Sequence, residues 1–330
     1  MKNGIPYSKI IGTGSSLPAK ILTNADLELM VDTSDEWITA RTGIKERRIA
    51  SDGEFTSTFA IEASRRALEM AGISAQELDL IILGTVTPDF PFPATSCIIQ
   101  HELKATNAVA FDISAACSGF VYGLSIADSY IRGGMAKKAL VIGAEVLSRI
   151  VNWNDRNTCV LFGDGSGAAV LELSTDDTGI MSTHIFTNGA FWDTLSQPAC
   201  GNRNPASQSV LDNQLSFIKM NGNDVFKYAV RAMEEAACTA LAANDMVSEN
   251  ISMFIPHQAN RRIIEATAKR LGLPEKNVFI NLENYGNTSS ASIPVALDEA
   301  NRGNKLNKGD SVMLDAFGGG FTYGSVLMRW

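Results

Sequence analysis

The sequence predicts an α/β protein built from two duplicated halves, residues 1–174 and 175–330, each with a mainly parallel sheet that carries helices on its faces. Three observations predict this fold class. Apolar runs typical of buried strands alternate with helical segments along the chain. The order of these elements occurs twice, and each copy ends in a Phe-Gly-x-Gly sequence, at 162–165 and 317–320. We therefore expect two sheets that pack through shared helices and are related by a pseudo-twofold axis.

The repeated order can be followed element by element. In the first half we expect a helix at 58–71, a strand at 78–84, a helix around Ile98, a strand at 109–113, a helix at 120–132, a strand at 139–143 and a closing strand to Leu173. Their counterparts are a helix at 225–242, a strand at 251–255, a helix around Ile263, a strand at 278–282, a helix at 291–302, a strand at 311–315 and a closing strand to Met328. An extra segment near 145–160 accounts for the wider spacing in the first half. The alternative is a chance recurrence of patterns that are common in α/β chains.

The composition is that of an ordinary globular protein, with 45% hydrophobic and 19% charged residues among 330, enough for two domain-sized cores. No uninterrupted apolar run reaches the ~18 residues of a membrane span, and the amino terminus lacks the apolar core of a signal peptide. The net charge of −8 argues against broad nucleic-acid binding. Five scattered cysteines without a CxxC pair suggest neither zinc nor disulfides. We expect a cytoplasmic protein that needs no metal and no cofactor.

The most informative motif is Ser-Ala-Ala-Cys-Ser-Gly at 114–119, which places Cys117 between a predicted strand and a predicted helix. Unpaired backbone N–H groups and the positive end of the dipole at a helix N-terminus favour a thiolate. The small neighbours would let a substrate carbonyl approach the sulfur. We therefore interpret Cys117 as a nucleophile for acyl transfer through a thioester. The alternative is a small buried apolar residue, the usual role of a free cysteine.

Two later segments supply partners for the sulfur, Pro-His-Gln-Ala-Asn at 256–260 and Gly-Asn-Thr-Ser at 286–289. His257 and Asn287 each follow the carboxyl end of a predicted strand, as Cys117 does, and such ends converge on one crevice in open α/β sheets. We expect His257 to donate a hydrogen bond or to carry a proton. The alternatives are a structural histidine and an Asx turn at Asn287.

Two further segments suggest binding. The glycines at 318–320 would let backbone N–H groups approach an oxyanion, although a tight turn between two strands would use the same residues. The predicted helix after residue 260 carries Arg262 and Lys269 on one face and turns Ile264, Ala268 and Leu271 inward. This basic patch would bind an acidic partner or, alternatively, be an ordinary solvated face.

Together these motifs resemble β-ketoacyl-acyl carrier protein synthase III of the thiolase superfamily, and the similarity runs from about Lys9 to Trp330. It is carried by the motifs around 114–120, 256–260, 286–289 and 317–322, and by Thr-Ser-Asp-Glu-Trp-Ile at 33–38, Arg-Thr-Gly-Ile at 41–44 and Phe-Gly-Asp-Gly at 162–165. The resemblance implies a thiolase-like, five-layered αβαβα fold and a homodimer. It also implies a triad of Cys117, His257 and Asn287. This triad would condense a short acyl-coenzyme A, acetyl-coenzyme A above all, with malonyl-acyl carrier protein to initiate fatty acid synthesis through acyl-Cys117.

The resemblance also implies a site for coenzyme A. Trp37 and Arg156 match positions that hold the adenine, and Arg41 matches a position near the phosphates. Gly222 and Asn260 match positions along the pantetheine channel. An extra segment of one half, which contains Arg156, would therefore have a binding role.

Three more assignments follow from the same resemblance. The backbone N–H groups of Cys117 and Gly319 would form the oxyanion hole, and Phe92 matches a position that limits the acyl pocket to an acetyl-sized group. Acyl carrier protein would dock on the basic residues Lys227, Arg262, Lys269 and Arg270. Ser118, Tyr285 and Ser290 depart from the residues frequent in the family, which leaves the choice of substrate open.

Three alternative functions stay open on the same residues. One is a synthase of secondary metabolism that uses another starter or an extender bound to coenzyme A. Another is a non-catalytic acyl-binding subunit on the same scaffold. The third is a cysteine hydrolase, in which water rather than a malonyl carbon accepts the acyl group.

Overall fold

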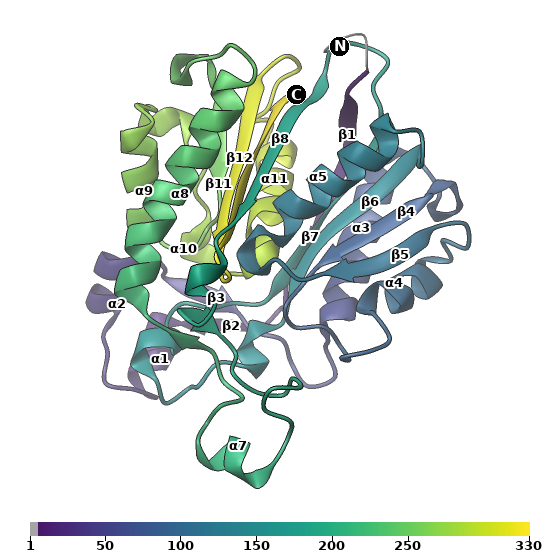
Figure 1. Cartoon of the computed structure of the whole chain (residues 1–330). Helices are drawn as coiled ribbons and strands as arrows, with labels where there is room; N and C mark the ends of the chain where they lie inside the picture. The colour runs from purple at the N-terminus through teal and green to yellow at the C-terminus, as the bar shows by residue number, and fades with distance from the viewer. Residues whose placement is uncertain (1–5) are drawn as a thin grey trace.

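The computed structural model describes residues 6–330 and has five layers, which Figure 1 shows as helices, sheet, helices, sheet and helices. One outer layer contains α3 (Thr56–Ala71) and α4 (Thr95–Leu103), the middle layer α5 (Gly119–Arg132) and α11 (Ser292–Arg302), and the other outer layer α8 (Gly222–Ala242) and α9 (Arg261–Arg270). Both middle helices contact both sheets. The expected αβαβα arrangement is confirmed, while the division into halves at 174/175 stays a prediction.

The two sheets are mixed. The first has the order β1 (Ser8–Ser16), β7 (Gly165–Leu173), β6 (Lys138–Glu145), β4 (Leu80–Gly84), β5 (Val109–Ile113), and the second the order β11 (Met253–Pro256), β12 (Ser311–Gly318), β13 (Thr322–Arg329), β8 (Gly179–Thr187). β4 is parallel to β5 and β6, and β11 is parallel to β12, whereas β1, β7, β13 and β8 are antiparallel to their neighbours. The expectation of mainly parallel sheets is therefore wrong. One reason is physical: a short connection, such as the turn between β12 and β13, can join only antiparallel strands. The other is that the strands β1 and β8, which are antiparallel to their neighbours, were not predicted.

Shorter elements complete the chain. Figure 1 shows α1, α2, β2, β3 and α7 at the end of the molecule opposite both termini. The short strands and helices are β2 (Ile21–Thr23), α1 (Asn24–Glu28), α2 (Asp35–Thr42), β3 (Glu46–Arg48), α6 (Arg156–Cys159), β9 (Leu195–Ser196), α7 (Gln208–Asp212), β10 (Lys219–Met220) and α10 (Leu282–Tyr285). The single 3₁₀ turns are η1 (Ala75–Glu77), η2 (Ala116–Ser118), η3 (Leu147–Arg149), η4 (Gly189–Phe191), η5 (Ser248–Asn250), η6 (Glu275–Asn277) and η7 (Ser289–Ala291). The extra segment expected near 145–160 forms η3 and α6.

The expectation of a strand at 278–282 is wrong. The structure has a single bridge there, between Phe254 and Val278, followed by α10. Phe279 N donates to Phe254 O at 2.9 Å, but the ladder stops because Pro256 has no N–H to donate next. The Gln258 side chain takes the place of the missing strand partner. Its Nε2 donates to the carbonyls of Pro256 and Phe279, and its Oε1 accepts from the next free backbone N–H.

The core between the two sheets is built on α5 and α11. Phe120 and Leu124 from α5 and Leu297 from α11 have no exposed surface, and Ile293 has 1%. Burial of each such side chain contributes roughly 1.5–3 kcal/mol to folding. Because α5 begins directly after η2 and α11 directly after η7, this packing also fixes the two turns that face each other across the sheets.

Glycines at the carboxyl ends of β4 and β6 permit the close packing of backbone segments around these two turns. A Cβ on Gly143 would lie 2.1 Å from Ser290 O, and a Cβ on Gly84 would lie 2.7 Å from Gly119 C. Neither distance is compatible with a side chain. At Gly84 the start of α5 therefore rests directly on β4, and at Gly143 backbone from the second half of the chain rests directly on β6.

We predict that Gln258→Ala lowers the free energy of unfolding by about 1–3 kcal/mol, because buried carbonyl and N–H groups lose their partners. Urea unfolding at one protein concentration measures the change. The matched control is Gln76→Ala at an exposed position, which should change stability by no more than about 0.5 kcal/mol. Equal midpoints for the two variants would contradict the interpretation.

Candidate active site

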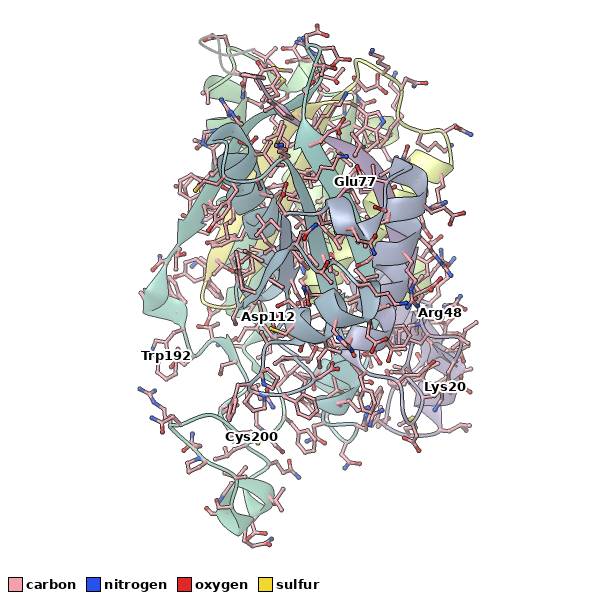
Figure 2. All side chains as sticks on the ribbon, turned by 90° about the vertical axis from the view of Figure 1, so that its right-hand side faces the viewer. Lys20, Arg48, Glu77, Asp112, Trp192 and Cys200 are labelled. Carbon is pink, nitrogen blue, oxygen red and sulfur yellow. The ribbon has the colours of Figure 1, made fainter. Side chains whose placement is uncertain are left out.

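Cys117 lies in η2, between the end of β5 and the start of α5, as the sequence predicts. Its neighbour Ala116 has a φ of 45°, an uncommon left-handed conformation for a residue with a Cβ. Asp112 on β5, labelled in Figure 2, accepts hydrogen bonds from the N–H groups of Thr95 and Ser96 at the start of α4. The strand that leads to the cysteine is thereby fixed, and the Cys117 side chain is buried.

The protonation of Cys117 differs from expectation. Burial raises the pKa of its thiol to about 12, while an interaction with the Ser289 side chain lowers it and the nearby charge of Glu145 raises it further. The direction of the shift is opposite to the one that a helix N-terminus predicts, because burial disfavours the charged thiolate. Burial therefore favours the neutral thiol of Cys117 over its thiolate.

His257 follows β11 and is almost fully buried. Its backbone N–H donates to Asp315 O at 2.8 Å, and its Nδ1 lies 2.7 Å from Ser292 Oγ. The same oxygen accepts from Gln258 N at 3.2 Å, so its hydrogen is available for Nδ1. Burial lowers the pKa of His257 to about 3. The ring is therefore neutral, and the bond from Ser292 places its remaining hydrogen on Nε2.

Asn287 joins the two halves of the chain at the site. Its backbone N–H donates to Leu161 O at 2.8 Å, and its carbonyl accepts from Gly163 N at 3.0 Å. The side-chain Oδ1 accepts from Ser289 N at 2.8 Å. Since the oxygen is engaged in this Asx turn, the NH₂ group is the end of the amide that is available to a substrate.

The structure brings Cys117, His257 and Asn287 together on one narrow cavity of about 140 Å³. Gly222 and Asn260, the residues expected along the pantetheine channel, line the same cavity. Its other walls are mainly apolar, from Leu161, Phe162, Leu195, Met220, Val225, Phe226, Ala229, Met233, Ala259, Ile263, Phe317 and Gly318. The polar groups are thus few and converge on the sulfur, which is typical of a specific small-molecule site.

Cys117 also lines a second cavity, of about 110 Å³, together with Ser289 and Gly319. The other residues around it are largely apolar, namely Val86, Ala116, Leu147, Ile150, Phe162, Leu195, Ser196, Gln197 and Ile218. The sulfur therefore lies where a cavity with polar donors meets an apolar one.

The glycine-rich turn between β12 and β13 packs against η2. Ser118 Oγ donates to Thr322 O at 3.0 Å, and Thr322 Oγ1 donates to Ala115 O at 2.7 Å. A Cβ on Gly318 would lie 2.6 Å from Cys117 N. The backbone at Cys117 and the backbone next to Gly319 are therefore neighbours, as an oxyanion hole requires.

Two guanidinium groups lie over the ring of Trp37 on α2. Those of Arg41 and Arg156 lie 4.7 and 5.0 Å from its ring centroid. Asn260 Nδ2 donates to Arg41 O at 3.1 Å, while its Oδ1 caps α9 by accepting from Arg262 N. The three residues expected at the adenine and phosphates therefore form one cluster, and Asn260 connects this cluster to the cavity that contains Cys117.

The four residues expected to bind acyl carrier protein are exposed on two adjacent helices, Lys227 on α8 and Arg262, Lys269 and Arg270 on α9; we call them the basic face. Arg262 borders the cavity, because its guanidinium lies 5.6 Å from the ring of the lining residue Phe226. Arg270 differs from the others, since it forms a 2.5 Å ion pair with Glu234. The expected inward side of α9 is confirmed, because Ile264, Ala268 and Leu271 are buried.

Phe92 is placed differently from expectation. Its side chain is 86% exposed and lines neither of the two cavities at Cys117. The irregular segment between β4 and α4, which contains three prolines, carries it outward. In this chain the walls of the apolar cavity include Leu195 and Ile218, which the sequence did not single out.

Sequence reasoning also missed four polar residues that support the site: Glu145, Gln258, Ser289 and Ser292. A signal existed for Glu145, because a carboxylate that ends a buried strand stands where functional residues of α/β sheets gather. The other three act through loop conformations that no periodicity encodes.

Two searches of the described residues bear on function. Among residues 6–330, no group of three or more His, Cys, Asp and Glu side chains is arranged to hold a metal ion. In the same range no helix is both long and apolar enough to cross a membrane. The expected independence of cofactors and the cytoplasmic location stay predictions.

Comparison with known proteins identifies the family. The family models described as "3-Oxoacyl-[acyl-carrier-protein (ACP)] synthase III" and as its C-terminal part match residues 111–189 and 241–330. The beta-ketoacyl-[acyl-carrier-protein] synthase III of Caldanaerobacter subterraneus subsp. tengcongensis is 54% identical over 321 residues, 97% of each chain. The chain belongs to the β-ketoacyl-acyl carrier protein synthase III family. It is thus a condensing acyltransferase of fatty acid initiation, and the alternatives of a non-catalytic subunit and a hydrolase are set aside.

Solved structures of such synthases share the thiolase fold described above. The crystal structure of the 3-oxoacyl-[acyl-carrier-protein] synthase III from Aquifex aeolicus VF5 is 51% identical, covers 98% of this chain and 100% of its own, and has a TM-score of 0.92. The priming β-ketosynthase of the R1128 polyketide pathway is 35% identical, with a TM-score of 0.91 and coverage of 98% and 96%. The same fold therefore occurs in relatives of differing pathways.

Proposed function

We propose that this synthase III condenses a short acyl-coenzyme A, preferentially acetyl-coenzyme A, with malonyl-acyl carrier protein through an acyl-Cys117 intermediate. The proposal depends on the position of Cys117, which lines both the narrow cavity shared with His257 and Asn287 and the apolar cavity. The first cavity suits a pantetheine arm that delivers a thioester, and the second suits the acyl chain that stays behind.

In the first half-reaction the Cys117 sulfur attacks the thioester carbonyl, a new C–S bond forms and coenzyme A leaves. The N–H groups of Cys117 and Gly319 stabilise the tetrahedral oxyanion. Loss of one such donor costs ~3–4 kcal/mol in other enzymes. The packing of the β12–β13 turn on η2 supports this assignment, because it holds the two backbone segments together.

In the second half-reaction the malonyl thioester loses carbon dioxide, and His257 and Asn287 donate hydrogen bonds to the oxygen on which enolate charge develops. The neutral ring with hydrogen on Nε2 and the free NH₂ of the amide support this role. The low pKa of His257 favours a donor over the proton carrier that the sequence left open. The carbanion then attacks the acyl-Cys117 carbonyl, the C–S bond breaks, and β-ketoacyl-acyl carrier protein is released.

The size of the apolar cavity supports a short acyl group as the starter. A cavity of about 150 Å³ holds a molecule the size of benzene, so about 110 Å³ favours a chain of few carbons. We predict at least tenfold higher kcat/KM for acetyl-coenzyme A than for octanoyl-coenzyme A in direct competition, with a short branched starter between them. A preference for the longer chain would contradict this and would favour the alternative of another starter.

We also propose that two copies of this chain form a homodimer. β5 forms the edge of the first sheet, where it pairs with β4, and Val109 at its start is 63% exposed. An edge strand offers free N–H and C=O groups to a second chain. A homodimer joined along β5 would cover this edge, and the molar mass in solution decides between one chain and two.

The division of roles predicts opposite defects in variants of the triad. Cys117→Ala should abolish covalent acetyl uptake, because no other cysteine lines either cavity. His257→Ala and Asn287→Ala should each lower decarboxylation of malonyl-acyl carrier protein by about 100-fold, the effect of losing one oxyanion donor, and leave acetyl uptake within about tenfold. Intact mass after incubation with acetyl-coenzyme A measures uptake, and release of carbon dioxide measures decarboxylation.

His101→Ala is the matched control, since His101 is exposed on α4, and it should leave both steps unchanged. Acetylation that persists in Cys117→Ala would refute the nucleophile. Equal losses of both steps in the His257 and Asn287 variants would refute the division between them.

The two substrates should respond to different surface changes. Trp37→Ala should raise KM for acetyl-coenzyme A about tenfold, because stacking of a base on an aromatic ring contributes roughly 1–3 kcal/mol, and should leave KM for malonyl-acyl carrier protein unchanged. Lys269→Glu should instead raise KM for malonyl-acyl carrier protein and leave KM for acetyl-coenzyme A unchanged. Arg270→Gln is an internal control with a smaller effect, since its charge is already paired. The same KM changes in all three variants would contradict separate sites.

A further inference from the structure

Glu145 is a fully buried carboxylate to which the proposed reaction assigns no role. It ends β6, and the segment that follows β4 supplies it with hydrogen bonds from the hydroxyls of Thr85 at 3.1 Å and Thr87 at 2.6 Å. The backbone N–H groups of Val86 and Thr87 donate at 3.1 Å each. Four donors of this kind can hold a carboxylate in its charged form away from water.

Two hydroxyls of η7 meet the other side of this carboxylate. Ser289 Oγ and Ser290 Oγ lie 3.1 and 3.0 Å from Glu145 Oε1. Ser290 also lies 2.7 Å from Gly84 O, and this shorter bond takes its single hydrogen. Ser289 is therefore the hydroxyl whose hydrogen is free for Glu145.

Ser289 reaches the nucleophile as well. Its side chain lies close enough to the Cys117 thiol to affect the pKa of that thiol, and both residues line the apolar cavity. Its φ of 50° is a strained conformation, which the contacts of its side chain with Glu145 and of its N–H with Asn287 maintain. Cys117, Ser289 and Glu145 thus form a continuous chain from the sulfur to a carboxylate.

We propose that Glu145 is the base that takes the Cys117 proton through the Ser289 hydroxyl during acyl uptake. The inference rests on the proposed function. As the sulfur attacks the acyl carbonyl, the thiol proton passes to Ser289 Oγ and the Ser289 hydroxyl proton passes to Glu145 Oε1. The carboxylate becomes a carboxylic acid, and coenzyme A leaves as a thiolate that takes its proton from water. When acyl-Cys117 is later cleaved, the proton returns along the same path to the sulfur, and the carboxylate is restored.

The chemistry of the neighbouring groups favours this path. A thiol with a pKa of about 12 needs a base, and His257, with a pKa of about 3, is a weak one. Burial raises the pKa of Glu145, which makes it a stronger base than an exposed carboxylate. The groups that face its carboxyl from the end of β4 and from η7 are hydroxyls and backbone amides, and the titratable group that faces it from η2 is Cys117 itself.

Three single variants of the full-length protein test the relay by quenched-flow mass measurement of acetyl uptake against pH. Glu145→Gln cannot accept a proton and Ser289→Ala breaks the path, so each should slow uptake about 100-fold at pH 7. Both variants should show a rate that rises with pH toward the pKa of the thiol, whereas the rate of the unmodified enzyme levels off. Ser290→Ala is the matched control, because Ser290 contacts the same carboxylate but not the thiol, and it should stay within about threefold.

A second measurement separates proton transfer from support of the fold. In a Cys117→Ala background, adding Glu145→Gln should leave decarboxylation of malonyl-acyl carrier protein within about threefold, since His257 and Asn287 perform that step. An equal fall in decarboxylation would overturn the relay in favour of a structural role. Uptake by Glu145→Gln at the unmodified rate and pH profile would overturn it as well. Neither result touches the proposed function, which fails separately if Cys117→Ala still takes up acetyl groups.

Discussion

The site depends on the contact between η7 and the end of β6. Because Gly143 has no side chain, the backbone at Ser290 rests directly on the end of β6. The turn belongs to the second half of the chain and the strand to the first. The cavity therefore exists only while the two halves are packed, and the buried faces of α5 and α11 supply most of that packing.

The arrangement of elements explains how much of the site could be foreseen. The meeting of Cys117 and His257 was predictable because each follows the end of a strand and such ends lie together in an αβαβα fold. Asn287 follows α10 instead of a strand, so only its short motif marked it. The support around the triad was not predictable. Gln258 replaces a strand partner because Pro256 lacks an N–H, and Ser292 meets His257 across a helix start. Such contacts depend on loop conformation, which no periodic pattern of residues in the sequence encodes.

The exposed ring of Phe92 shows a different limit. A motif places a residue along the chain, but the direction of an irregular segment depends on tertiary contacts that the motif does not contain. The same holds for the walls of the apolar cavity. Leu195 and Ile218 come from a long connection between β8 and α8, and nothing in their local sequence distinguishes them from ordinary core residues.

Burial acts in opposite directions on the two halves of the chemistry. It lowers the pKa of His257 and so favours the neutral ring, which in the proposed reaction suits a hydrogen-bond donor to the enolate oxygen, and it raises the pKa of the Cys117 thiol. In that proposal burial therefore suits the decarboxylation step and makes the thiolate of the nucleophile harder to form.

One mainly apolar cavity with few polar groups contains the sulfur, and Asn260 connects it to the cluster around Trp37. In the proposed reaction both substrates reach Cys117 through this cavity, so the first product has to leave before the second substrate can enter. Shared access of this kind gives ping-pong kinetics, in which an excess of either substrate competes with the other.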